Sequence, residues 1–402
     1  MLPVAEARAR ILEAVKPVPY EWVALPAAHG RVLARDLRAR RSQPPLPVSA
    51  MDGYAVRSED LREPGAALRV IGEVPAGRVF EGRLGPGEAV RIFTGAPLPE
   101  GADAILVQER AERSDDIVRA LVALPPGKFV RPAGLDFEAG WKGLAGGHLL
   151  DARALGLAAA MGHAWLPVRR RPRVAILATG DELVWPGETP GPAGIVSSNN
   201  PTLTAMVVGW GGAPLDLGIA RDRPEDLMRA LDQARDTDFV ITSGGASVGA
   251  YDLVRETLAA RGLEVAFWKI AMRPGKPLMF GRFGEIPFLG LPGNPVSAAV
   301  CAIVFLRAAL LRSLGRPTDL PIGRARLAVS LDANDEREDY MRGRWKRSPE
   351  GELLVEPASR QDSSMFATFA HADLLIRRPP HDPARPAGEE VEIIEIARAL
   401  AV

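Results

Sequence analysis

The segment from Val174 to about Leu314 constrains the fold most strongly, because short apolar runs alternate there with helix-forming runs of ten or more residues. The apolar runs include VAILAT and DFVITS, and the helical runs include PEDLMRALDQAR. Strands that are apolar along their whole length need cover on both faces. The pattern therefore predicts a doubly wound, mostly parallel α/β sheet, which binds ligands beyond the carboxyl ends of its strands.

Regions with a different pattern flank this α/β segment. Short apolar runs broken by Gly and Pro extend from 41 to 140, and strand-like runs return after 319. Residues 1–16 and 152–162 read as helices. We expect four parts: an N-terminal linker region (1–40 with 141–170), a small β-rich domain (41–140), the α/β domain (171–318), and a small antiparallel C-terminal β-barrel or sandwich (319–402).

The composition is that of a soluble globular protein without a dominant charge. Of 402 residues, 47% are hydrophobic and 25% are charged, and the net charge is zero. We therefore expect neither a nucleic-acid footprint nor a charged membrane-binding surface, and an anionic ligand would need a local pocket. The basic run VRRRPR at 168–173 reads as a solvated connector.

The single cysteine, Cys301, excludes an internal disulfide and a metal site made of several cysteines. It lies in the apolar helix AAVCAIVFLRAALL, where a buried structural thiol is expected. Arg307 interrupts that helix, which we expect to be too short to span a bilayer. The amphipathic start of the chain carries mixed charge, unlike a signal peptide, so a cytoplasmic location is expected.

Polar residues follow the strands of the α/β segment, where a parallel sheet binds its ligands. Residues 243–249 form a glycine-rich turn between a strand and a helix, which either donates N–H groups to a phosphate or simply reverses the chain. Glu182, Asp222 and Asp252 also lie after strands. Carboxylates beside a phosphate require a hard cation between them, although Asp222 could equally cap the helix that begins near Pro224.

Six segments match one protein family in the same order and spacing over nearly the whole chain. They are SAMDGYAV (49–56), RIFTGAPLPEGADAILVQE (91–109), LATGDELV (177–184), ITSGGASVGAYD (241–252), WKIAMRPGKPL (268–278) and LPGNPVSA (291–298). They resemble the molybdopterin molybdenumtransferases of the MoeA type, which are homologous to the E domain of gephyrin. The resemblance implies a Mg²⁺-assisted transferase of molybdenum cofactor biosynthesis. It takes adenylylated molybdopterin and molybdate, releases AMP and leaves molybdenum on the dithiolene of the pterin.

The resemblance also implies how subunits assemble. Members of the family are elongated homodimers of four-domain subunits; the first part of this chain would be the linker and dimerisation domain, and the third the molybdopterin-binding domain. The active cleft lies between the α/β domain of one subunit and the N-terminal domains of the other. Residues near Asp52 and Thr94 should therefore face residues near Glu182 and Asp252 across the dimer. The molybdopterin adenylyltransferase is a further expected partner.

The residue chemistry and the resemblance together predict three groups of site residues. The catalytic group is Asp52, Thr94, Glu182, Asp222 and Asp252, of which the last three are also the metal ligands. The molybdopterin substrate is expected at Asp136, Ser243, Gly244, Gly245, Ser247, Gly249, Pro292, Asn294 and Pro295. Molybdate is expected at Lys269, Arg273, Lys276, Pro277, Arg342 and Ser363. Such a tetrahedral dianion needs cationic donors and good hydrogen bonds.

The chain departs from the family pattern at three places. Arg273 stands where the family has Lys, which keeps the positive charge and adds a planar fork of donors. The loop 361–364, Gln-Asp-Ser-Ser, stands where the family reads Gln-Gly-Ser-Gly. We expect this change to alter access to positive φ and to add an anion beside the molybdate. Leu135 replaces a Glu next to Asp136.

Two other functions stay open at this stage. The molybdopterin adenylyltransferase shares the glycine-turn α/β domain and the pterin, but it has a single domain. This chain has about 170 residues before Val174 and a barrel after Leu314. A non-enzymatic scaffold of the gephyrin type would carry a second enzyme domain and a long disordered linker, and the sequence has the pattern of neither. Molybdate and tungstate differ too little in size and charge for the sequence to separate them.

Overall fold

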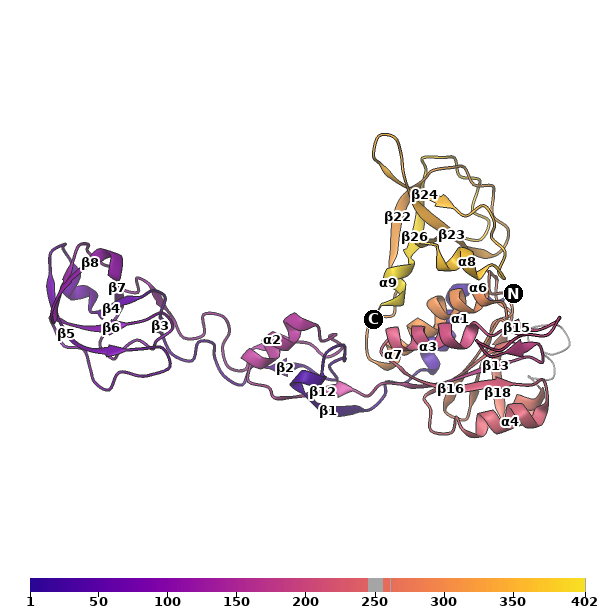
Figure 1. The fold of residues 1–402 in the computed structure, drawn as a ribbon, viewed down its shortest axis with the longest axis horizontal. Coiled ribbons are helices and arrows are strands. Elements are labelled where there is room, and N and C mark those ends of the chain that lie inside the picture. The colour runs from indigo at the N-terminus through magenta and orange to yellow at the C-terminus, as the bar shows by residue number, and fades with distance from the viewer. Residues whose placement is uncertain (245–255, 261, 402) are drawn as a thin grey trace.

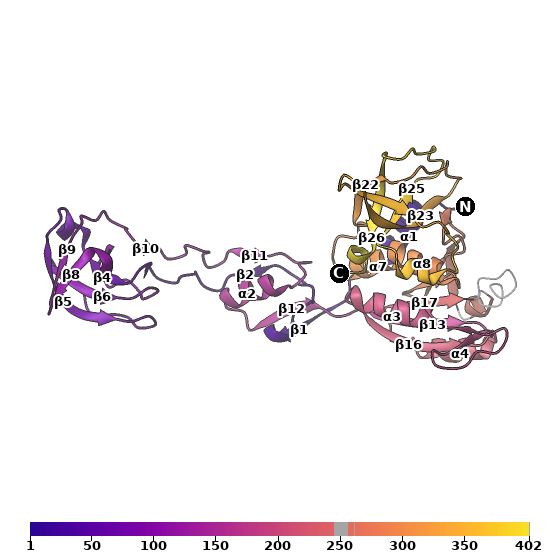
Figure 2. The same cartoon turned by 45° about the horizontal axis from the view of Figure 1, so that its top comes forward.

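A computed structural model describes residues 1–244, 256–260 and 262–401 of the chain. Figures 1 and 2 show an elongated molecule with a small β-rich unit at one end, a linking unit in the middle, and the α/β unit with a C-terminal barrel at the other end. The chain runs out to the β-rich end and returns, because β1 (Tyr20–Ala24) pairs antiparallel with β12 (Trp165–Arg169). Side chains at the two ends are therefore far apart within one chain.

The central sheet has six strands in the order β16-β13-β17-β21-β20-β18. The first four run parallel and are the apolar strands that the sequence predicted. The last two form an antiparallel edge that the sequence analysis missed, because Glu264 and Arg282 interrupt their apolar runs. The bounds are β13 Arg173–Thr179, β16 Ala213–Ala220, β17 Phe239–Gly244, β18 Leu263–Trp268, β20 Met279–Phe283 and β21 Ile286–Leu291.

Helices cover both faces of this sheet, and β13 shows how the sequence divides the core. Val174 and Ile176 pack toward α1, α3 and the long helix that follows β21. Ala175 and Leu177 point to the opposite face, toward α4 and the helical residues 256–260. The two-sided cover is the arrangement that the continuous apolar strands predicted. These helices are α1 Val4–Ala14, α3 Asn199–Gly209 and α4 Pro224–Asp232.

The long helix consists of α6 (Pro295–Cys301), a π-helical turn (Ala302–Leu306) and α7 (Arg307–Ser313). Its 19 residues are long and apolar enough to cross a bilayer, so the expectation that it is too short is wrong. Burial explains its composition instead, since 94% of its most apolar window lies inside the protein. Cys301 is fully buried, as predicted, and burial raises the pKa of its thiol.

The C-terminal unit is a closed five-stranded barrel. Its strands follow the order β23-β24-β22-β26-β25, and the additional pairing of β23 with β25 closes the ring. A short strand of the α/β unit, β19 (Met272–Arg273), pairs parallel with β23 and joins the two units. The sequence predicted the five barrel strands, which are β22 Ile322–Leu327, β23 Glu338–Arg347, β24 Leu353–Pro357, β25 Leu374–Arg378 and β26 Glu390–Glu395.

The β-rich end is a six-stranded sheet in the order β7-β4-β6-β5-β9-β8. Tyr54 and Leu106 pack on one of its faces, and Ala55 and Ile105 pack on the other. The strands are β4 Gly53–Val56, β5 Ala67–Val74, β6 Glu88–Ile92, β7 Ala104–Val107, β8 Ala111–Ser114 and β9 Ile117–Ala120.

Short strand pairs and one helix link this end to the α/β unit. The helix is α2 (Ala152–Ala160), and the Asp151 carboxylate caps it by accepting a hydrogen bond from the Ala154 N–H at 2.8 Å. The linking elements are β2 Leu37–Arg38 with β11 Lys142–Leu144, β3 Val48–Ser49 with β10 Val130–Arg131, and the helix α2 Ala152–Ala160.

The basic run at 168–173 is more than the solvated connector that we expected. Arg170 donates from both Nη atoms to the Asp238 carboxylate, at 3.0 and 2.8 Å. The same carboxylate accepts the Arg173 N–H at 2.6 Å, and Arg169 donates to the Val18 carbonyl at 2.8 Å. These bonds fasten the linking unit to the α/β unit, because a bidentate pair fixes orientation as well as distance.

Candidate active site

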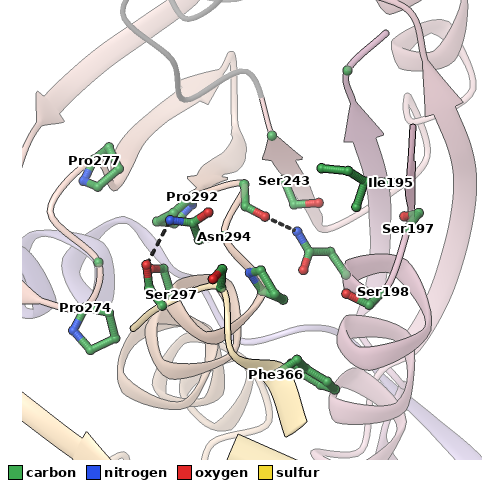
Figure 3. A pocket seen from close by; sticks show the side chains of 18 of the residues that line it. Ile195, Ser197, Ser198, Ser243, Pro274, Pro277, Pro292, Asn294, Ser297 and Phe366 are labelled. Carbon is green, nitrogen blue, oxygen red and sulfur yellow. Dashed lines mark hydrogen bonds between the residues drawn. The ribbon is translucent and has the colours of Figure 1, made fainter. Parts of the chain in front are cut away.

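A cavity of about 880 Å³ lies at the carboxyl ends of β13, β17 and β21, between the α/β unit and the barrel. We call it the strand-end cavity (Figure 3). Its position is the one that the parallel sheet predicted. It is lined by residues of six segments: 179–183, 195–199, 243–244, 272–277, 292–297 and 361–366; Asp222 and Arg337 complete the lining.

Glycine lets the ends of β13 and β17 approach each other at the base of this cavity. Gly244 has φ +111°, and a Cβ built on it would lie 2.0 Å from the Thr179 carbonyl oxygen. Only glycine can occupy this position without moving backbone. The hydroxyls of Thr179 and Ser243 are buried there, and neither has a hydrogen-bond partner within the described ranges. Two donors are thus left for a ligand at the strand ends.

A loop of the barrel is held over the start of the long helix. Asn294 Nδ2 donates to Ser363 Oγ at 2.8 Å, and the Val296 N–H donates to the Ser363 carbonyl at 3.1 Å. Asn199 Nδ2 donates to the Gly293 carbonyl at 2.9 Å and holds the turn from the other side (Figure 3). The predicted residues Pro292, Asn294, Pro295 and Ser363 therefore all line the cavity.

Carboxylates gather at another wall. Glu182 and Asp222 both line the cavity, and the Asp222 N–H donates to Asp181 Oδ1 at 3.2 Å. Burial, followed by the charges of Asp181 and Glu182, raises the pKa of Asp222. The alternative that Asp222 caps helix α4 is wrong, because Arg223 occupies the N-cap position and no side chain caps the helix.

The carboxylates of this wall fit part of the ligand set of a divalent cation. Asp222 Oδ1 is buried without a partner in the described structure, as a ligand oxygen deprived of its cation would be. Glu182, on the same cavity, supplies a second hard oxygen ligand. In the described ranges, no group of three His, Cys, Asp or Glu side chains is placed to hold a metal ion, and the third predicted ligand, Asp252, lies outside those ranges. The residues present fit a cation but supply only part of its ligand set.

The cationic loop 272–277 forms the opposite lining. Lys276 and Pro277 line the cavity, and Gly275 presses the loop against the long helix, where an added Cβ would lie 2.6 Å from Cys301 Sγ. Arg273 also lines the cavity, but carboxylates of the barrel already hold its guanidinium. Its Nη2 lies 2.5 Å from Asp339 Oδ2, its Nη1 lies 3.2 Å from Asp335 Oδ2, and Nη2 also donates to Asn334 Oδ1 at 3.1 Å. Hydrogen bonding to Asp339 accordingly raises the pKa of Arg273.

Two of the residues predicted to bind molybdate do not line the cavity. The Lys269 ammonium stacks over the Trp268 ring, 3.9 Å from its centroid. Arg342 is almost fully buried, and it donates from Nη2 to the Asp362 carbonyl at 3.0 Å and from its backbone N–H to Gln361 Oε1 at 2.9 Å. Arg342 therefore supports the loop that carries Ser363.

The loop 361–364 accommodates its two replaced glycines without strain. Neither Asp362 nor Ser364 is among the non-glycine residues with positive φ, so the loop does not need glycine at either position. The Asp362 carboxylate accepts the Ser364 hydroxyl at 2.6 Å and the Ser364 N–H at 2.8 Å, and these bonds lower its pKa. Asp362 does not line the cavity, because its carboxylate faces Ser364 instead.

The remaining predicted residues lie elsewhere. Asp52 Oδ1 accepts the Thr94 N–H at 2.8 Å and the Thr94 hydroxyl at 2.7 Å, which lowers the pKa of Asp52. Both belong to the β-rich end, beside β4 and β6, remote from the strand-end cavity (Figures 1 and 2). Asp136 lines a separate cavity of about 540 Å³ near the same end. Gly245, Ser247, Gly249 and Asp252 lie outside the described residues.

The sequence analysis missed the polar run at the start of α3. Ser197, Ser198 and Asn199 line the cavity after the short strand β15 (Ile195–Val196), which pairs with β14 (Leu183–Val184). The Ser197 hydroxyl is buried without a partner in the part of the chain that the structure describes. The signal was present as the sequence SSNN at the start of an apolar helix, but the sequence analysis did not consider Ser197, Ser198 or Asn199.

Fold and cavity together define a multidomain α/β protein that presents carboxylates, a lysine and hydroxyls without a partner among the described residues to one cavity. Three family models match consecutive parts of the chain: the MoeA N-terminal region (domain I and II) at residues 2–162, a probable molybdopterin binding domain at 175–312, and the MoeA C-terminal region (domain IV) at 324–396. The matches cover each of the units described above.

Individual relatives agree with these matches. A molybdopterin molybdenumtransferase of Haemophilus influenzae is 34% identical over 98% of both chains. One from Nostoc sp. is 38% identical over 80% of this chain and 76% of its own. The crystal structure of a MoeA molybdopterin biosynthesis protein from Pyrococcus horikoshii matches with a TM-score of 0.88 and 32% identity, over 98% of this chain and 99% of its own. The chain belongs to the MoeA family of molybdopterin molybdenumtransferases.

Proposed function

We propose that the protein inserts molybdenum from molybdate into adenylylated molybdopterin, with release of AMP, in molybdenum cofactor biosynthesis. The observation that carries the proposal is the composition of the strand-end cavity. Hydroxyls without a partner in the described structure, a carboxylate pair and the loop with Lys276 line one space between two units. Relatives that match nearly the whole chain bear the name of this transferase.

The residues at the base of the cavity suit a phosphoanhydride substrate. Breaking a phosphoanhydride requires charge stabilisation on its non-bridging oxygens more than a strong nucleophile. We assign the Thr179 and Ser243 hydroxyls and the N–H groups near Gly244 to the phosphate of the substrate. Pro292, Asn294 and Pro295 shape the wall beside it. The predicted extension of this site to Gly245, Ser247 and Gly249 remains a proposal about residues outside the described ranges.

Glu182 and Asp222 are the proposed ligands of Mg²⁺, together with Asp252. When bound there, a divalent cation would neutralise negative charge on the phosphate oxygens. The chain itself holds the two carboxylates on one wall of the cavity. Burial and the acidic neighbours of Asp222 raise its pKa there. Without the cation these carboxylates would repel a phosphate in the same cavity.

Molybdate is proposed to lie at the loop 272–277. Lys276 offers a charged donor for which the described structure has no other side-chain partner, and Pro277 and Ser363 lie on the same cavity. We assign Arg273 and Arg342 mainly to holding this loop and the Ser363 loop, because their strongest contacts are with the barrel. Lys269 would have to leave the Trp268 ring to reach the oxyanion.

A homodimer completes the proposed site. Asp52, Thr94 and Asp136 cannot reach the strand-end cavity of their own chain, so we propose that a second subunit brings them there. Asp52→Ala and Glu182→Ala should each abolish turnover, and a mixture of the two after subunit exchange should recover part of it. A mixture that stays inactive would contradict the shared site. A cytoplasmic location and contact with the adenylyltransferase that supplies the substrate complete the proposal.

Release of AMP from adenylylated molybdopterin, measured with and without molybdate, tests the function. We expect AMP release coupled to the appearance of the molybdenum cofactor. Formation of the adenylate from molybdopterin and ATP would instead identify an adenylyltransferase. Neither that activity nor a scaffold function is favoured, because the named transferases match both terminal regions of the chain as well as its centre.

A further inference from the structure

Three arginines lie together where the N-terminal helix packs against the long helix, away from the strand-end cavity. Arg8 is in the middle of α1, Arg307 begins α7, and Arg316 follows the end of α7. Helices α1 and α7 are in contact (Figure 1), and Arg8 and Arg316 are both close enough to lower the pKa of Arg307 by repulsion, after the larger effect of its burial. We call these residues the three-arginine cluster.

The cluster has few partners for its charge. Arg8 Nη2 donates to the Thr318 carbonyl, and Arg307 Nη1 donates to the Asp319 carbonyl at 3.0 Å. The Nε atoms of all three arginines and Nη1 of Arg316 are buried without a hydrogen-bond partner in the described structure. Among the described residues no carboxylate forms an ion pair with any of the three, and Asp319 offers its backbone oxygen rather than its side chain.

Such an arrangement is unfavourable unless something else supplies negative charge. Only 8% of Arg307 is exposed, and burial also lowers the pKa of Arg316. Arginine nevertheless stays protonated near neutral pH, so the cost of an uncompensated buried charge remains. Two other arginines are buried in the described structure. Arg378 donates to the Asp382 carboxylate, which is buried with it. Arg342 forms no ion pair there, but the charges of Asp339 and Asp362 are close enough to counter the effect of burial on its pKa. Arg307 differs from both, because the charged groups that act on it in the described structure are the two other arginines of the cluster.

A small cavity adjoins the cluster. It has a volume of about 190 Å³, and Arg8 is the member of the cluster that lines it, together with Asp319, whose carbonyl accepts the bond from Arg307. Glu338 also lines it, but this carboxylate already accepts hydrogen bonds from Arg377 Nε at 2.7 Å and from the Tyr340 hydroxyl at 2.6 Å. The cavity has ample room for one small ion, since a water molecule occupies about 30 Å³ in the liquid.

We propose that Arg8, Arg307 and Arg316 bind a tetrahedral oxyanion, of the type of phosphate or molybdate, at a site distinct from the strand-end cavity. An oxyanion accepts several hydrogen bonds at once, and guanidinium groups are the side chains best suited to donate them. The ion would supply the negative charge that the described structure lacks. The inference does not depend on the proposed function, because none of the three residues lines the strand-end cavity.

The sign of a stability change tests the proposal in the full-length protein. In buffer free of oxyanions, Arg316→Met should melt at the same temperature as the unsubstituted protein or higher, because it removes an unpaired buried charge. Added inorganic phosphate should raise the melting temperature of the unsubstituted protein above that of the variant. Arg312→Met, in the exposed last turn of α7, is the matched control and should leave the response to phosphate unchanged.

Titration calorimetry separates this site from the strand-end cavity. We expect Arg307→Met and Arg316→Met each to weaken the binding of one phosphate by about tenfold or more, as for a lost charge-assisted bond, while any second site is unaffected. Arg307→Lys, a milder change, should weaken it less. Repeating the titration with molybdate shows which oxyanion binds more tightly. Equal phosphate binding by all variants would overturn the proposal. So would a loss of dimers in Arg316→Met, because the arginines would then be partners of a second subunit.

Discussion

Replacing Arg273 by lysine introduces the residue that the family resemblance implies at this position, yet the structure predicts that this change is not neutral. Lysine can keep the bond to Asp339, but its single nitrogen cannot also reach Asp335 and Asn334, which Arg273 contacts at 3.2 and 3.1 Å. Asp335 keeps its bonds to Arg337, which together with Arg273 lower its pKa to about 2, so it is not left unsatisfied. We expect a loss of about 1 kcal/mol in the free energy of unfolding.

Arg273→Met should cost more, because it removes the nearest cation from Asp339. That side chain is only 8% exposed, while Arg273 is 44% exposed. Breaking a fully buried pair costs about 3–5 kcal/mol, and the exposure of the arginine places this case near the lower end, at about 3 kcal/mol. Asp339→Asn in the Arg273→Met background should recover part of the loss, since it removes the uncompensated charge.

Urea unfolding followed by circular dichroism measures both changes. Arg282→Met is the matched control, because Arg282 pairs with the exposed Glu285 beside the β20–β21 turn of the same unit and should contribute below about 1 kcal/mol. Unchanged unfolding midpoints in both Arg273 variants would refute the reasoning. A tenfold loss of molybdate affinity in Arg273→Met with full stability would refute it as well, because Arg273 would then be free to bind the anion.

Three further changes test other parts of the site. Asp222→Asn should raise the free energy of unfolding at neutral pH and abolish metal-dependent activity. Because the pKa of Asp222 is raised in the folded state, the folded protein loses stability as the pH rises from the ordinary aspartate pKa through the raised one. The gain from the substitution should therefore vanish in melting experiments at a pH below that window. Gly244→Ala should lower the free energy of unfolding by roughly 2–4 kcal/mol, since its Cβ would lie 2.0 Å from the Thr179 carbonyl oxygen. Gly191→Ala is the control, because its Cβ would meet nothing within 4 Å. Equal urea midpoints for the two variants would contradict the packing argument. Lys276→Ala should weaken apparent molybdate affinity about ten- to hundredfold and leave binding of the adenylylated pterin almost unchanged; equal loss for both would make the loop a general anion attractor.

The α/β sheet was predictable where burial is continuous, and less so at its edge. The runs of β13, β17 and β21 are apolar because both faces are covered, which is a property of local sequence. The strands β18 and β20 contain Glu264 and Arg282, which are not fully buried, since an edge is covered on fewer sides. Their partners are near in the chain, since β20 pairs with β21 across the two-residue turn 284–285 and β18 pairs with β20, but the polar residues hid the strand pattern.

The site was predictable where its residues directly follow the buried strands of the sheet. Motifs at Glu182, Ser243 and Asn294 lie after apolar strands, and the rule that parallel sheets bind ligands at their carboxyl ends was sufficient to bring them together. The polar run before α3 was missed, because a serine that lines a cavity and one that begins a helix look alike in sequence. Whether Ser197 is free was decided only by what surrounds its hydroxyl.

The sequence by itself determined the layers, the family and the presence of a cationic loop, because each depends on residue order alone. The tertiary structure decided what each charge does. Arg273 and Lys276 are equivalent as charges in the sequence, but barrel carboxylates hold the first, while no side-chain partner for the second appears in the described structure. Likewise the Asp362 carboxylate accepts a hydrogen bond from the Ser364 hydroxyl. Arg316 forms no ion pair with a carboxylate among the described residues. The physical reason is that a charge acts through its neighbours within a few ångströms, and the fold brings those neighbours from distant parts of the chain.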